Sequence, residues 1–301
     1  MLDDHEGPIQ DYVQGMSAAN MRTRDVKRPI VSPLRYPGGK SSLYSRLRAI
    51  VRANNLTTGT YVEPYAGGAG AALGLLATGQ VRRIVINDLD PAIFAFWTAV
   101  VKFPAEFSEL INRVDLTVDE WVKQKSVYAE APRDDYLRLG FATFFLNRTN
   151  RSGVLNGGPI GGMDQTGNYK IDARFNRSTL VERIRIVGLH ANRITVSNLD
   201  GMSVIKRYSK RANTLIYADP PYFEKAGSLY MNSFKAGDHA ALADCLNGLR
   251  ESNWLLTYDN APEVETLYAN RRREVFSLGY SAHRVVKAKE IMVFSDKLEI
   301  A

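Results

Sequence analysis

The chain has 301 residues, of which 45% are hydrophobic and 24% charged, an ordinary composition for a globular protein with a sizeable core. Its single cysteine, Cys245, excludes an internal disulfide framework and a Cys-rich zinc site, and no apolar run is long enough to cross a bilayer. The net charge of +7 favours polyanionic partners such as nucleic acid, although many basic proteins bind none.

The first 28 residues are polar and lack a steady hydrophobic period, so we expect a mobile leader at 1–28. This segment has neither a basic start nor an apolar h-region, and no secretory signal is expected there. Together with the lone cysteine, this predicts a reducing, cytoplasmic setting.

From about residue 32, strands and helices are expected to alternate as they do in a parallel α/β sheet. The first half should contain a Pro/Gly-rich loop at 32–40, a helix on Leu43, Leu47 and Ile50, a strand at 61–63, a Gly-rich turn at 64–70, a helix at 71–77, a strand at 83–87 and a helix from Pro91. The second half should contain strands at 194–197, 214–218 and 254–258, a helix from Asp238, and closing antiparallel strands at 275–278 and 291–294.

This alternation is interrupted between residues 102 and 189, where helical patterns lead into a Gly-rich loop. Thr179 and Glu182 have capping-box spacing for a helix that reaches His190. We therefore expect an inserted, mainly helical subdomain at 102–189. The main domain should comprise 29–101 and 190–301, and the arginine triplet at 271–273 should be a solvated surface turn within it.

The most informative stretch is Asp219-Pro220-Pro221-Tyr222, which directly follows the buried strand predicted at 214–218. Open α/β sheets bind ligands at the carboxyl ends of their strands, and proline can neither donate to a ladder nor continue a helix. We expect a rigid lip in which the Asp219 carboxylate and the Pro220 carbonyl accept hydrogen bonds beside the Tyr222 ring. Such a lip suits a planar molecule with an exocyclic amino group. The alternative is a simple strand-ending turn.

A second candidate site is the turn from Glu63 to Gly70, which joins a strand to a helix as in a nucleotide-binding βαβ unit. Its glycines, Gly67 among them, allow a ligand to approach the backbone closely. Asp88, at the end of the next strand, can accept hydrogen bonds from ribose hydroxyls; the alternative for it is a helix N-cap ahead of Pro91. The pattern indicates an adenosine-containing cofactor.

The type of cofactor follows from two details. The triplet Gly39-Lys40-Ser41 is not a phosphate-binding P-loop, because Leu34 stands where that motif requires glycine. Glu63 places an anion beside the Gly-rich turn, which would repel phosphate but attract a cation such as a sulfonium. This favours S-adenosylmethionine over NAD.

Four motifs, Arg35-Tyr-Pro-Gly-Gly-Lys40, Val62-Glu-Pro-Tyr-Ala-Gly-Gly-Ala-Gly70, Asn87-Asp88 and Asp219-Pro-Pro-Tyr222, occur in the order seen in Dam-type DNA adenine N6-methyltransferases. The chain resembles that family from about residue 32 to its end, with looser similarity at 147–153, 257–260 and 289–294. The resemblance implies an α/β fold with a Rossmann-like S-adenosylmethionine-dependent methyltransferase sheet and an inserted, mainly helical DNA-recognition subdomain.

The resemblance also implies roles for individual residues. The family motifs assign binding of S-adenosylmethionine to Tyr36, Lys40, Asp88 and Asp219, and the Gly-rich turn described above adds Glu63 and Gly67. The residues expected to be catalytic are those of the lip, Asp219, Pro220, Pro221 and Tyr222. Tyr36 replaces the tryptophan of some members and Tyr65 the usual phenylalanine; both replacements keep an aromatic ring.

The implied reaction transfers a methyl group to adenine N6, which requires the base to be rotated out of the duplex. Tyr222, with help from Phe223, would stack on the extruded ring, while Asp219 and the Pro220 carbonyl accept both N6 hydrogens so that the nitrogen lone pair faces the methyl group. No strong general base and no metal are expected, since His190, His239 and His283 lack metal-ligand spacing. Cys245 is interpreted as a buried structural thiol and not as a nucleophile.

DNA binding is assigned to Arg148 and Arg151 and to the Gly-rich loop at 153–162, with Tyr222 contacting the extruded base. Whether these arginines read guanine edges or hold phosphates stays open. The expected partners are double-stranded DNA and a cognate restriction endonuclease, with no membrane association, and the chain is expected to act near the nucleoid as a monomer or weak dimer. Alternatives are a methyltransferase for RNA adenine or cytosine N4, an NAD-dependent oxidoreductase, and a nucleic-acid-binding module without activity.

Overall fold

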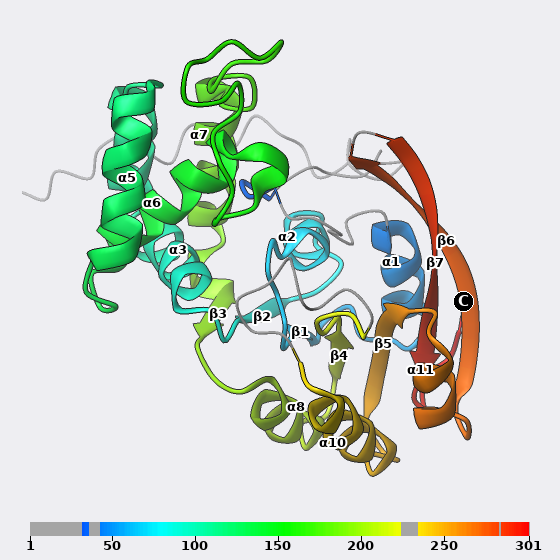
Figure 1. The fold of residues 1–301 in the computed structure, drawn as a ribbon. Helices are drawn as coiled ribbons and strands as arrows, with labels where there is room; N and C mark the ends of the chain where they lie inside the picture. The colour runs from blue at the N-terminus through cyan, green and yellow to red at the C-terminus, as the bar shows by residue number, and fades with distance from the viewer. Residues whose placement is uncertain (1–31, 36–42, 224–233, 283, 301) are drawn as a thin grey trace, which may run out of the picture.

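A computed structural model describes residues 32–35, 43–223, 234–282 and 284–300, and gives the backbone alone for 278–282 and 284–288. The leader expected at 1–28 lies outside this range. Seven strands in the described part form one sheet with the order β3-β2-β1-β4-β5-β7-β6 (Figure 1). The strands are β1 (Thr60–Glu63), β2 (Arg83–Asn87), β3 (Ile194–Ser197), β4 (Thr214–Ala218), β5 (Asn253–Asp259), β6 (Arg272–Ala282) and β7 (Arg284–Phe294).

Strands β1 to β5 are parallel, and β7 and β6 close the sheet in antiparallel pairing. The direction of winding reverses between β1 and β4, where Val62 pairs with Ile216. Two adjacent strands whose connections leave in opposite directions open a crevice at their carboxyl ends, the usual ligand position in such sheets. The sheet and its helices confirm the predicted α/β, Rossmann-like class.

Helices cover both faces of the sheet (Figure 1). One face is covered by α1 (Tyr44–Ala53), α2 (Gly70–Ala77) and α3 (Pro91–Lys102), and the other by α8 (Gly201–Ser209), α10 (Ala236–Asn247) and α11 (Pro262–Leu267). Strand residues alternate between the two cores: Tyr61 and Tyr217 join the first, whereas Val62 and Ile216 join the second. Because both faces are buried, the central strands are almost continuously apolar.

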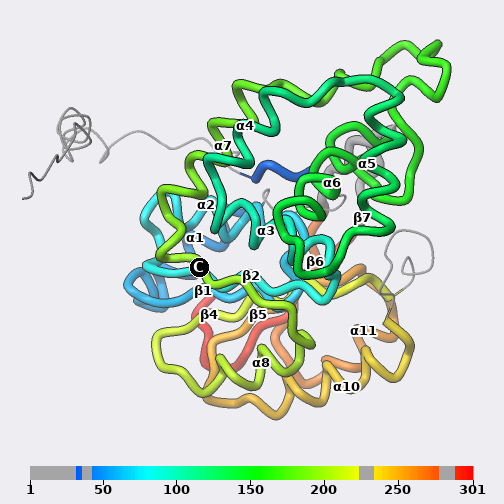
Figure 2. The backbone as a smooth tube through the Cα atoms, turned by 90° about the vertical axis from the view of Figure 1, so that its left-hand side faces the viewer, coloured from blue at the N-terminus to red at the C-terminus, as the bar shows by residue number. Residues whose placement is uncertain are grey.

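The segment between α3 and β3 is mainly helical, as expected from the sequence. It contains α4 (Pro104–Arg113), α5 (Val118–Glu130), α6 (Tyr136–Thr149), the 3-10 turn η3 (Arg151–Gly153), α7 (Arg177–Leu189) and the 3-10 turn η4 (Ala191–Arg193). Figure 2 shows α4–α7 gathered on the α2–α3 side of the sheet, away from α8, α10 and α11. The rings of Phe96 on α3 and Phe144 on α6 are stacked with centroids 6.0 Å apart, so these helices share one core with the sheet.

Two predicted helix starts need correction. The N-cap of α7 is Asn176, whose Oδ1 accepts a hydrogen bond from the Thr179 amide at 2.9 Å, and not Thr179 itself. Glu182, the other half of the predicted capping box, instead pairs with Arg185 one turn further along. The N-cap of α3 is Asp90, whose carboxylate accepts from the Ala92 amide at 2.8 Å, so Asp88 is available for another role.

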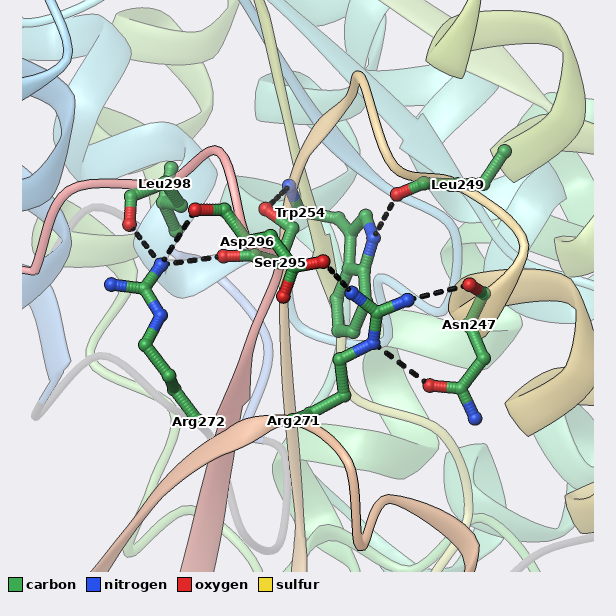
Figure 3. Close-up of polar contacts among 8 residues, drawn as sticks. All are labelled: Asn247, Leu249, Trp254, Arg271, Arg272, Ser295, Asp296 and Leu298. Atoms are coloured by element: carbon green, nitrogen blue, oxygen red, sulfur yellow. Dashed lines mark hydrogen bonds and ion pairs between the residues drawn. The ribbon is translucent and has the colours of Figure 1, made fainter.

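The arginine triplet at 271–273 is not a turn, because Arg272 and Arg273 begin β6, although both are exposed. Its first member, Arg271, is not solvated (Figure 3). Arg271 is only 9% exposed; its guanidinium pairs with Asp296 at 2.5 Å and donates to the Asn247 side chain at 3.0 Å, above the Trp254 ring. Arg272 donates to the Ser295 carbonyl at 2.7 Å. These contacts tie the start of β6 to the end of β7 and to α10, because a buried guanidinium must satisfy its donors locally. No helix in the described ranges is long and apolar enough to span a membrane.

Candidate active site

Five carboxylates lie at one edge of the sheet, at or just beyond the strand ends. Glu63 ends β1, Asp88 follows β2, Asp219 follows β4, Asp259 ends β5, and Glu290 on β7 is paired with Asp259. The parallel strands bring their carboxyl ends to the same edge, and β7 runs antiparallel to β5, so that its pairing with β5 begins at that edge with Glu290. The topology thus concentrates acidic side chains beside the winding switch between β1 and β4.

Asp88 holds the Gly-rich turn in place. Its two carboxylate oxygens accept hydrogen bonds from the amides of Gly67 at 2.8 Å and Asp90 at 2.9 Å. The turn has left-handed backbone at Gly67 (φ 47°) and Ala69 (φ 45°), a conformation that glycine adopts readily and alanine only at a cost. Burial raises the pKa of Asp88 to about 6, although the two amide donors favour its ionised form.

Glu63 lies deeper, with 4% of its surface exposed, beneath the start of α2. Its Oε1 accepts a hydrogen bond from the Ala72 amide at 3.1 Å. Burial raises the pKa of Glu63 to about 8, and the nearby Asp219 carboxylate adds to this shift. Glu63 is therefore largely protonated at neutral pH, which differs from the fixed anion assumed from the sequence. A cation placed beside it would favour ionisation.

Asp219 is fixed by a short chain of hydroxyl groups. Thr257 on β5 donates to the Asp219 carboxylate at 2.7 Å, and its Oγ1 lies 2.8 Å from the Tyr217 hydroxyl. If Thr257 donates to Asp219, the buried Tyr217 hydroxyl must donate to Thr257. The carboxylate is thus held by β5 as well as by the rigid Pro220-Pro221 step that follows it.

Tyr222 and Phe223 are held by two acids that face each other across neighbouring strands, Glu290 on β7 and Asp259 at the end of β5. The Tyr222 hydroxyl donates to Glu290 Oε1 at 2.7 Å, and the Phe223 amide donates to Asp259 Oδ1 at 2.9 Å. Phe223 also packs on the buried His239 ring, with centroids 4.7 Å apart. The tyrosine, three residues after Asp219 in the chain, is therefore tethered at the far end of its ring.

Apolar side chains lie exposed beside Asp88. Leu89 is 50% exposed and Leu199, in the loop after β3, is 43% exposed. The buried Asn87 side chain positions this loop, since its Oδ1 accepts from the Leu199 amide at 3.0 Å and its Nδ2 donates to the Pro64 carbonyl at 2.8 Å. An acid followed by an exposed leucine, with a second exposed leucine held by the preceding asparagine, offers hydrogen-bond acceptors and apolar surface together, which suits a nucleoside.

Comparison with known proteins decides the family. A model of the D12 class N6 adenine-specific DNA methyltransferases matches residues 36–288, most of the chain. The chain belongs to this family. It is also 24% identical over 226 residues to the modification methylase StsI of Streptococcus sanguinis, an alignment that covers 69% of this chain and 31% of that protein. The chain thus spans about a third of the length of that relative.

Two solved structures are more distant. A candidate RNA methyltransferase from Pyrococcus horikoshii has a TM-score of 0.40 at 11% identity, with 92% of this chain and 94% of that chain covered. The rRNA methyltransferase AviRa from Streptomyces viridochromogenes has a TM-score of 0.36 at 13% identity, with 96% and 93% covered. The fold of this D12 family member is accordingly read from its own strand order.

The site residues predicted from the sequence fall into three groups. Those at the shared sheet edge are Glu63, Gly67, Asp88, Asp219, Pro220, Pro221 and Tyr222. Tyr36 and Lys40 lie outside the described residues. Arg148 and Arg151 lie at the end of α6 and in η3, in the helical insertion and not at the sheet edge itself.

The two arginines differ in their surroundings. Arg148 is half-buried and donates to the Pro33 carbonyl at 3.5 Å, and burial lowers its pKa to about 9, with Arg183, Arg35 and Arg174 nearby adding to the shift. Arg151 is exposed. Arg35, at the start of the loop expected to bind the cofactor, is joined to α6, because its backbone amide donates to Asn147 Oδ1 at 2.7 Å. Arg148 therefore has a structural contact, whereas Arg151 faces solvent.

The sequence did not point to the roles of Asn87, Thr257 and Glu290, although all three lie within stretches that resemble the family. Each is a polar residue within or at the end of a strand, and each contacts a residue distant in the chain. Their polarity within buried strands was the available signal. The partner of each depends on strand register, which one sequence does not reveal.

Proposed function

We propose that this chain is a site-specific DNA adenine N6-methyltransferase that uses S-adenosylmethionine. The observation that carries the proposal is the fixed lip at the end of β4: Asp219 is held by Thr257 and Tyr222 by Glu290, beside the turn that Asp88 holds. A tethered carboxylate next to a tethered aromatic ring matches the needs of a planar base with an amino group. Membership of the D12 class supports adenine as that base.

The residues at the sheet edge fit the proposed cofactor. Asp88 is half-buried and its carboxylate retains acceptor capacity beyond the two amides it holds, while Leu89 and Leu199 supply apolar surface for an adenine ring. Glu63 can ionise in response to a nearby positive charge. S-adenosylmethionine supplies an electrophilic methyl group on a sulfonium, so the protein needs to position its substrate and stabilise charge.

In the proposed reaction the chain's own residues act on the amino group. The Asp219 carboxylate and the Pro220 carbonyl accept hydrogen bonds from the two N6–H groups, which reduces conjugation of the nitrogen with the ring. The Tyr222 ring stacks on the extruded base and holds it in plane. Since Thr257 restrains one Asp219 oxygen, the carboxylate can keep a single orientation while the base is bound.

The contacts with DNA are assigned to the insertion, residues 102–189, while 29–101 and 190–301 form the catalytic domain. Arg151 in η3, together with Met163 at 56% and Tyr169 at 66% exposure in the following loop, presents cationic and apolar groups on one connected segment. Such a combination suits a DNA duplex whose stacking must be disturbed. The partner in this proposal is double-stranded DNA.

The cellular role is part of the same proposal. The relative from Streptococcus sanguinis is named a modification methylase. We extend that role to this chain, acting at the nucleoid in the cytoplasm as a monomer or weak dimer beside a cognate restriction endonuclease.

The decisive experiment is sequencing that detects modified bases, on DNA from cells that express the chain. N6-methyladenine at one recurring sequence is expected, and Asp219→Ala should abolish it while purified protein keeps its melting temperature to within a few degrees. Asp244→Ala, which removes an exposed acid on α10, is the matched control and should modify DNA as the wild type does. Methylated cytosine, or wild-type modification by Asp219→Ala, would contradict the proposal.

A further inference from the structure

A buried acid on the closing hairpin contacts the Asp-Pro-Pro-Tyr segment. Glu290 lies on β7, more than sixty residues after Tyr222 in the chain, and its surface is only 1% exposed. Its Oε1 nevertheless accepts a hydrogen bond from the Tyr222 hydroxyl at 2.7 Å. Burying a carboxylate is unfavourable unless polar partners compensate for the lost water, so a carboxylate kept at this position calls for a specific role.

The acid does not act alone on this segment. Glu290 is paired in register with Asp259 on the neighbouring strand β5. Asp259 Oδ1 in turn accepts a hydrogen bond from the backbone amide of Phe223 at 2.9 Å. Two acids on neighbouring strands thus hold consecutive residues, one by a side chain and one by the main chain. Tyr222 is restrained at its hydroxyl, and the backbone immediately after it is restrained as well.

The hydrogen bond from Tyr222 to Glu290 restrains the tyrosine side chain, which the two prolines cannot do. Pro220 and Pro221 limit their own backbone angles, yet they leave the Tyr222 side chain free to choose among staggered rotamers. A ring that stacks on a base must lie parallel to it, and a wrong rotamer would fill the space that the base needs. A hydrogen bond at the far end of the ring selects one orientation before the base arrives.

We propose that Glu290 is a positioning residue that fixes the orientation of the Tyr222 ring for stacking on the extruded adenine. The inference rests on the proposed function for its catalytic consequence, but the contact between Glu290 and Tyr222 does not depend on that function. Glu290 acts through Tyr222 and not on the base. It follows that the hydroxyl of Tyr222 matters for activity even though only the ring faces the base.

A double-mutant cycle tests this inference. Tyr222→Phe keeps the ring but removes the hydroxyl, and Glu290→Ala removes the acceptor. Each should lower kcat/KM for a duplex that contains the unmethylated target sequence by about ten- to hundredfold, the usual range for a hydrogen bond to a charged group. The double variant should be no worse than the poorer single variant. Glu290→Gln, which retains an acceptor oxygen, should lose less activity than Glu290→Ala.

Several controls separate positioning from a general structural effect. Glu274→Gln changes a half-exposed acid on β6 of the same hairpin and should leave activity unchanged. If the losses of the two single variants multiply in the double variant, Glu290 acts independently of Tyr222 and the inference is wrong. If Glu290→Ala does not fold, Glu290→Met, which has a similar volume and no oxygen acceptor, takes its place in the cycle with Tyr222→Phe.

A readout that does not require activity distinguishes this inference from the proposed function. A 3-fluorotyrosine placed at position 222 should give one sharp ¹⁹F resonance in the otherwise wild-type chain, and a shifted or broadened one in Glu290→Ala. An unchanged resonance would overturn the contact even in an active enzyme. A wild-type chain that methylates no DNA but shows the expected ¹⁹F change would instead remove the proposed function and retain the contact.

Discussion

Glu63 and Asp88 hold protons more tightly in the folded chain than free acids do. Burial raises their pKa values to about 8 and about 6, from ordinary values of 4.5 and 3.8. At a pH between the ordinary and the raised pKa of each acid, the folded chain keeps a proton that the unfolded chain releases. The free energy of unfolding therefore falls as pH rises from about 4.5 through 8. A bound sulfonium should reverse this relation at Glu63, because a positive charge favours the ionised carboxylate.

We therefore expect S-adenosylmethionine to bind more tightly as pH rises from about 6 to about 8.5, by up to about tenfold per unit below the pKa of Glu63. Binding should release a proton from Glu63. Isothermal titration calorimetry in buffers of different ionisation enthalpy measures both effects. In Glu63→Gln, whose amide oxygen can still accept from the Ala72 amide, the affinity should change less with pH. The same dependence of affinity on pH in this variant and in the wild type would rule out this role for Glu63.

Most elements of the sheet could be predicted, because buried parallel strands are short apolar runs between turn residues. The prediction for β4 matches the observed Thr214–Ala218, and the Asp-Pro-Pro-Tyr segment is contiguous with it. The burial of Arg271 and the contact of Glu290 with Tyr222 could not be predicted. The burial and the contact both depend on the register with which the hairpin of β6 and β7 pairs with β5, which the sequence does not reveal. A run of arginines has the same local sequence whether it is exposed or buried.

A similar limit applies to the contact between α3 and α6, which joins the insertion to the sheet. Gly140 on α6 lies so close to α3 that a Cβ there would be 2.8 Å from the Ala95 carbonyl oxygen and 2.9 Å from Phe96 Cα. These are backbone atoms, so they cannot move aside without separating the helices. In the sequence, Gly140 only weakens a predicted helix, and its packing role is visible in the structure alone.

Gly140→Ala should destabilise the chain by about 1–3 kcal/mol despite the better helix propensity of alanine, because overpacking forces the two helices apart. Gly237→Ala in α10 is the matched control. A Cβ at Gly237 would meet nothing within 4 Å, so this variant should gain about 0.5–1 kcal/mol. Urea denaturation of both variants measures the two changes, and equal stabilities would show that the α3–α6 contact tolerates a methyl group.

Positive charge is concentrated in the second half of the insertion. Residues 147–189 contain seven Lys and Arg against three Asp and Glu, whereas residues 102–146 contain six against eight. Burial lowers the pKa of Arg148, and Arg183, Arg35 and Arg174 lie close enough to lower it further. None of these four arginines takes part in the ion pairs seen among the described residues. A concentration of unneutralised cations on one side is the electrostatic requirement for holding DNA.

DNA affinity should therefore fall steeply with salt, because each phosphate that a Lys or Arg neutralises contributes about −0.9 to the slope of log K against log salt. Arg151→Gln removes an exposed guanidinium from the insertion and should reduce the magnitude of that slope by about one. Lys210→Gln, at the end of α8 beneath the opposite face of the sheet, is the matched control and should leave the slope unchanged. Fluorescence anisotropy with a labelled duplex at several salt concentrations gives all three slopes. A loss of affinity confined to one DNA sequence, with the slope unaltered, would show that Arg151 reads a base and does not hold a phosphate.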